Sequence, residues 1–120
     1  MKKIRVPIFT EEYAINIYIG KEDEMLKAAA KYMKCSFSAI KNQFEGNRGM
    51  AWNCLPEWNP LIGVNGELPF RVAIATLAHE ACHAMDYIIQ KVGIEDKSGE
   101  FRCHGISAVV REVCKAFKKF

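Results

Sequence analysis

Apolar and polar residues alternate along the first part of the chain and then recur at helical spacing. Residues 3–9 and 13–19 carry Ile, Val, Phe and Tyr in near alternation around a polar Thr-Glu-Glu turn, which predicts a pair of strands. Residues 22–34 repeat apolar positions every three or four residues, with acids leading and lysines trailing, which predicts a helix. Residues 37–44 are expected to form a turn or a short helix.

The second half of the chain contains the strongest helical signal. Between residues 46 and 69, which are rich in Gly, Asn and Pro, the apolar runs 50–55 and 61–64 predict two short strands joined by an irregular link. Pro69 opens a run without a helix breaker that ends at Gly93, which predicts one long helix. Its apolar positions cover most of its circumference, so it is expected to run through the core. Ser98 is the expected cap of a final helix.

These elements predict a single domain of the α+β class over residues 1–120. We expect a small, twisted, mainly antiparallel sheet packed on the long helix and on the C-terminal helix. Half of the 120 residues are hydrophobic, enough for a modest core without disulfides. The pattern gives no indication of the oligomeric state.

Charge, hydropathy and cysteine usage narrow the class of protein. The chain has 17 Lys and Arg against 14 Asp and Glu, and a net charge of +3 is too small to indicate nucleic acid or a membrane as a partner. No stretch is long enough to span a membrane, and the first residues lack the apolar run of a signal peptide. The five irregularly spaced cysteines suit reduced thiols. The sequence therefore predicts a cytoplasmic protein.

The long helix contains the segment His79-Glu80-Ala81-Cys82-His83. Residues four apart project from one helical face, so both imidazoles can reach a single zinc ion. Zinc in a catalytic site takes neutral imidazoles and leaves one position for water. Glu80 projects about 100° further round the helix and can face that water as a general base. The alternative is a chance match, although burying these three groups without a partner would cost roughly several kcal/mol.

With this motif the chain resembles the zincin metallopeptidases. It is most similar to small gluzincins, either the minigluzincins or compact phage-type metallopeptidases. The resemblance implies a zincin-like fold, Zn²⁺ as the cofactor and hydrolysis of a peptide or protein substrate. In gluzincins a glutamate on the following helix is the third metal ligand, and Glu100 stands where the resemblance requires it. His104, four residues later, is the alternative third ligand.

Several further residues are candidates for supporting roles. Asp86 shares the stripe of the two histidines and can orient an imidazole N–H. Tyr87, His104 and Arg102 are candidate donors to the oxyanion, and their spacing does not choose among them.

The resemblance also implies that residues 49–53 form an edge strand, with residues 61–66 as its hairpin partner. A substrate strand would then pair with Ala51, Trp52 and Asn53. The side chains of Trp52 and Trp58 are expected to be packing anchors.

The expected reaction is zinc-dependent peptide-bond hydrolysis, with Glu80 taking a proton from water and delivering it to the leaving amine. Two alternatives stay open. One is a zinc-binding or regulatory module without turnover, which closure of the site by a fourth ligand would mark. The other is a latent protease that needs a partner, because a chain of 120 residues has little surface with which to form a deep cleft.

Overall fold

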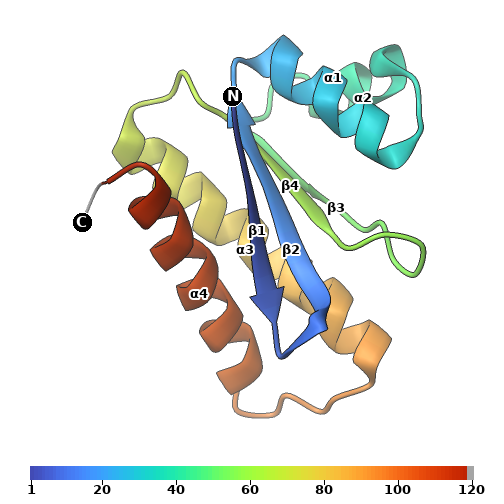
Figure 1. Ribbon diagram of the computed structural model, residues 1–120, viewed down its shortest axis with the longest axis vertical. Helices are drawn as coiled ribbons and strands as arrows, with labels where there is room; N and C mark the ends of the chain where they lie inside the picture. The colour runs from blue at the N-terminus through green and yellow to red at the C-terminus, as the bar shows by residue number, and fades with distance from the viewer. Residues whose placement is uncertain (119–120) are drawn as a thin grey trace.

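A four-stranded sheet lies between two layers of helices in the computed structural model, which describes residues 1–118 (Figure 1). The strands stand in the order β1-β2-β4-β3, so β3 lies at one edge. Their bounds are β1 Lys2–Ile8, β2 Thr10–Gly20, β3 Gly49–Trp52 and β4 Leu61–Asn65. The helices are α1 Glu22–Met33, α2 Phe37–Phe44, α3 Phe70–Val92 and α4 Glu100–Ala116. The sequence prediction of each element is confirmed, with shifts of one to three residues at most ends.

The sheet is mixed. The pairs β1–β2 and β3–β4 are antiparallel, as expected, but β2 and β4 run parallel in the middle. The expectation of a mainly antiparallel sheet therefore holds for the two outer pairs only. Parallel strands need a long crossover, which α1, α2 and β3 supply here. Because β4 is covered on both faces, four of its five residues are buried, and its apolar run does not alternate with polar residues.

The two faces of the sheet carry separate cores. Side chains from β1, β2 and β4 pack against α3 and α4 on one face, around Ile17, Ile62 and Met85. On the other face α1 and α2 cover β3 and β4, around Leu26, Phe44 and Trp52. The helix α3 is thus fixed along one face of the sheet, and this contact places its motif beside β3.

The two ends of α3 follow the sequence signals. Pro69 precedes the first helical residue, and Gly93 ends the helix with a positive φ of 81°, a conformation that glycine adopts without strain. The start of α4 differs from the prediction, because Ser98 does not cap it. Instead, the carboxylate of Asp96 accepts hydrogen bonds from the backbone N–H groups of Phe101 and Arg102.

Two global expectations concern membranes and thiols. Within residues 1–118, no helix combines the length and the hydropathy needed to cross a membrane. All five cysteines lie in this part of the chain and are free thiols. The predicted domain extends to residue 120, and residues 119 and 120 lie outside the described part.

Candidate metal and catalytic site

The imidazoles of His79 and His83 lie side by side on the exposed face of α3. Their ring centroids are 5.0 Å apart and the rings meet edge to face. Both residues are exposed, and the side chain of His79 keeps 70% of its surface accessible. The sequence argument that burial of the histidines would demand a metal therefore does not apply. What remains is their proximity on one helical turn, which suits two ligands of one ion.

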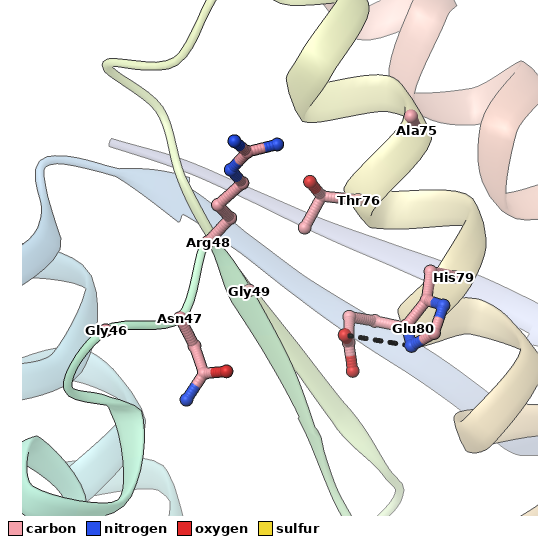
Figure 2. Close-up of a pocket in the computed structure, with 8 residues that line it drawn as sticks. All are labelled: Gly46, Asn47, Arg48, Gly49, Ala75, Thr76, His79 and Glu80. Carbon is pink, nitrogen blue, oxygen red and sulfur yellow. Dashed lines mark ion pairs between the residues drawn. The ribbon is translucent and has the colours of Figure 1, made fainter.

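Glu80 is the shielded member of the motif, with a side chain that is only 13% exposed. Its Oε2 lies 4.0 Å from Nε2 of His79, and Figure 2 shows the carboxylate turned back toward that ring. Burial raises the pKa of the Glu80 carboxyl, while the nearby imidazoles and a hydrogen bond from the Ala51 backbone N–H oppose this shift. A carboxyl with a raised pKa is suited to accept and return a proton.

The edge strand β3 runs directly beside Glu80. Arg48 and Asn65 are bonded through the Arg48 carbonyl, so the peptide groups of alternate residues, Gly49 and Ala51, point away from β4. Two side chains of α3 meet Ala51 there. Glu80 accepts from its N–H, and the Tyr87 hydroxyl donates to its carbonyl over 3.5 Å. The edge expected to receive a substrate strand is thus partly occupied by residues of the motif helix.

The other residues predicted for the edge are divided between core and surface. The Trp52 side chain is buried and stacks on Phe44, with ring centroids 6.4 Å apart, so it acts as a packing anchor as expected. Trp58 is half-buried beneath the Lys34 ammonium. Asn53 is exposed, and its side-chain oxygen accepts from the backbone N–H of Leu55.

Glu100 and His104 are not brought to the histidines. Together with Phe9 and Phe101 they line a separate hollow beside the β1–β2 turn. The reason is the rotation of α4 about its own axis, which decides which of its residues face α3. Arg102 contacts α3, and residues two positions away on either side project about 160° from it. Within residues 1–118, no three His, Cys, Asp or Glu side chains are grouped so as to hold a metal.

Asp86 and Arg102 are bound to each other rather than to the motif. Nε of Arg102 donates to Oδ1 of Asp86 over 2.8 Å, and the same guanidinium lies 4.0 Å from Asp96. This ion pair joins the C-terminal half of α3 to the start of α4. The sequence predicts Asp86 as a hydrogen-bond partner of a histidine and Arg102 as a candidate oxyanion donor. In this structure the two side chains form an ion pair with each other instead.

A hollow of about 440 Å³ opens between α3 and the start of β3. Its wall residues come from the α2–β3 loop and from two turns of α3 (Figure 2): Gly46, Asn47, Arg48, Gly49, Ala75, Thr76, His79 and Glu80. Sequence reasoning missed Asn47, Arg48 and Thr76. The available signal was the Gly-Asn-Arg-Gly segment directly before the predicted edge strand, to which no role was assigned from the sequence.

No protein-family model, curated protein or solved structure matches this chain.

Proposed function

We propose that this protein is a zinc-dependent peptidase in which His79 and His83 bind the metal and Glu80 is the general base. The observation that carries the proposal is the pairing of two exposed imidazoles, 5.0 Å apart, with a shielded carboxylate whose pKa is raised. His79 and Glu80 line a hollow beside the edge strand β3, where a peptide has room to bind.

The donor set fits zinc in part. Neutral imidazoles are preferred zinc ligands, and the two rings are accessible from solvent. A catalytic site generally adds a third protein ligand, for which Glu100, with His104 as the alternative, remains our proposal. Since both project from the far side of α4, their use requires the start of α4 to change its position relative to α3. Without that change the ion has two protein ligands.

Glu80 has the central chemical role in this proposal. Its carboxylate takes a proton from the attacking water and passes it to the amine of the broken peptide bond. Zinc, when bound, supplies Lewis-acid activation for this attack. Because burial raises the pKa of the Glu80 carboxyl, it holds the transferred proton more readily than an exposed glutamate does.

A substrate is expected to add to β3 as a further strand. The edge of β3 that faces away from β4 offers the peptide groups of Gly49 and Ala51, which alternate with those bonded to β4. The N–H and C=O of Ala51 are hydrogen-bonded to Glu80 and Tyr87, and these bonds must break before a substrate strand can pair with Ala51.

One alternative is favoured by a specific observation. The third ligand candidates face away from the histidines, and the edge strand is partly occupied by α3. A latent peptidase that is completed by a partner would show both features. A zinc-binding module without turnover would share the histidine pair but would not need Glu80.

The proposal is tested by digestion of a peptide library with the zinc-supplemented protein, with and without a chelator. We expect cleavage that the chelator stops and that Glu80→Gln abolishes, while Glu80→Gln still binds zinc. Glu67→Gln, which changes an exposed carboxylate in the loop before α3, is the matched control and should cleave normally. Retained cleavage in Glu80→Gln contradicts the proposal. Zinc binding by the unaltered protein without any cleavage favours the binding module or the latent form.

A further inference from the structure

Arg48 is a cation without an ionic partner on the wall of the α3–β3 hollow. It is exposed at the end of the α2–β3 loop, and no carboxylate in residues 1–118 forms an ion pair with its guanidinium. Thr76 stands across from it on the α3 wall, whereas the Asn47 amide points the opposite way from the neighbouring residue (Figure 2). The Thr76 hydroxyl already donates to the Val72 carbonyl and the Asn47 amide to the Gln43 carbonyl, so the Arg48 guanidinium is the one of these three donors with no hydrogen-bond partner in residues 1–118.

The charges of the hollow are separated along its length. The Glu80 carboxylate lies at the end next to the histidines, whereas Arg48 lies at the end next to the α2–β3 loop. An anionic group would be repelled by Glu80 and attracted by Arg48. Guanidinium binds carboxylates through two parallel N–H···O hydrogen bonds, a geometry that a lysine ammonium cannot reproduce.

The direction of β3 decides which part of a peptide reaches Arg48. The strand runs from Gly49 to Trp52, so Arg48 lies at its N-terminal end. A peptide that pairs antiparallel with β3, the more stable arrangement per residue, points its C-terminal end toward Arg48. If the bond to be cut lies beside Glu80, the residues that follow this bond enter the hollow.

We propose that Arg48 is a specificity-determining residue that selects peptides with a carboxylate on the C-terminal side of the cleaved bond. This inference rests on the proposed peptidase function. The carboxylate is either an Asp or Glu side chain or the free C-terminus of the peptide. The volume of about 440 Å³ accommodates a few residues beyond the bond, so both sources fit the hollow.

The test measures peptide binding in the zinc-supplemented Glu80→Gln background, where turnover is removed. Four dye-labelled eight-residue peptides of otherwise identical, uncharged sequence are compared by fluorescence anisotropy. One has a free C-terminal carboxylate, one is amidated with no acid, one is amidated with Glu near its C-terminal end, and one is amidated with Glu near its N-terminal end.

We expect at least one of the two C-terminal carboxylate peptides to bind about five- to tenfold more tightly than the amidated neutral peptide. Arg48→Gln should remove this advantage, Arg48→Lys should retain part of it, and Arg111→Gln, which changes an exposed arginine on α4, should leave it intact. The preferred peptide identifies the source of the carboxylate.

Three results would overturn the inference: no peptide binding, an advantage that persists in Arg48→Gln, or an advantage only for the peptide with an N-terminal Glu. Cleavage by the unaltered chain separates the two proposals. Arg48-dependent carboxylate binding without cleavage would leave the hollow as a peptide-binding site and would refute peptide hydrolysis by this chain alone. Cleavage without a carboxylate preference would refute only the role of Arg48.

Discussion

The hydroxyl of Tyr87, on the motif helix, donates a hydrogen bond to the backbone carbonyl of Ala51 on the edge strand, over 3.5 Å. Glu80, about two helical turns earlier on α3, accepts a hydrogen bond from the backbone N–H of the same residue, Ala51. The helix that carries the proposed base therefore also positions the strand along which a substrate would lie. Changes at this contact affect the site without removing a metal ligand.

Tyr87→Phe tests whether this hydroxyl positions the strand or stabilises an oxyanion. A 3.5 Å hydrogen bond is long, so we expect the free energy of unfolding to fall by at most about 1 kcal/mol in urea titrations. For a strand-positioning hydroxyl, kcat should fall by less than about tenfold, whereas loss of an oxyanion donor costs about 100-fold or more. A 100-fold loss in kcat with an unchanged KM would assign Tyr87 to the oxyanion instead.

Glu80→Gln should stabilise the metal-free protein at neutral pH. Burial raises the pKa of the folded carboxyl above its unfolded value, so the folded state loses stability as the pH rises through the folded pKa. Glutamine is never ionised, and the substitution removes this loss. Thermal unfolding should therefore show a higher Tm for Glu80→Gln at pH 7 and equal Tm values below about pH 3, where glutamate is protonated in both states. A lower Tm for the variant at pH 7 would contradict the direction of the shift.

Gly49→Ala should destabilise the junction of β3 and α3. A Cβ at this position would lie 2.6 Å from Cγ2 of Thr76 and 3.0 Å from the carbonyl oxygen of Gly63. The backbone carbonyl is fixed by the sheet, so we expect a loss of about 1–3 kcal/mol in the free energy of unfolding, measured by urea titration. Thr76→Ser removes the closer of the two atoms and should restore part of the stability in the double variant. Additive losses in the double variant would rule out this clash as the cause.

Asp96→Ala should loosen the start of α4. The Asp96 carboxylate accepts from the N–H groups of Phe101 and Arg102, and its loss leaves both without their partner. We expect a loss of about 1–2 kcal/mol in the free energy of unfolding, with faster amide exchange at these two positions. Glu95→Ala changes a neighbouring exposed carboxylate and should alter stability by no more than about 0.5 kcal/mol. Similar exchange rates in the two variants would exclude the capping role.

The elements with local signals could be predicted from the sequence. Pro69 and Gly93 bound the long helix because their backbone preferences act at the residue itself. The parallel pairing of β2 with β4 could not be derived in this way, because it depends on how residues 21–60 cross from one strand to the next. The continuous apolar run of residues 61–64 was the one local sign of a strand covered on both faces.

The same distinction applies to the candidate site. The proximity of His79 and His83 follows from helical geometry alone, so the sequence predicted it. Whether Glu100 reaches them depends on the rotation of α4 about its own axis. That rotation is set by contacts such as Arg102 with Asp86 and the close approach of Gly105 to Met85, which leaves no room for a Cβ. The spacing of residues along the chain does not encode these contacts.

Zinc binding by the histidine pair tests the central claim most directly. Isothermal titration, supported by native mass spectrometry, would compare the unaltered chain with His79→Ala, His83→Ala and the doubly substituted protein. We predict one zinc ion per chain and a loss of affinity of about 100-fold or more for each single substitution, with no specific site left in the double variant. A doubly substituted protein that binds one zinc as tightly as the unaltered chain would contradict the assignment of the metal to His79 and His83.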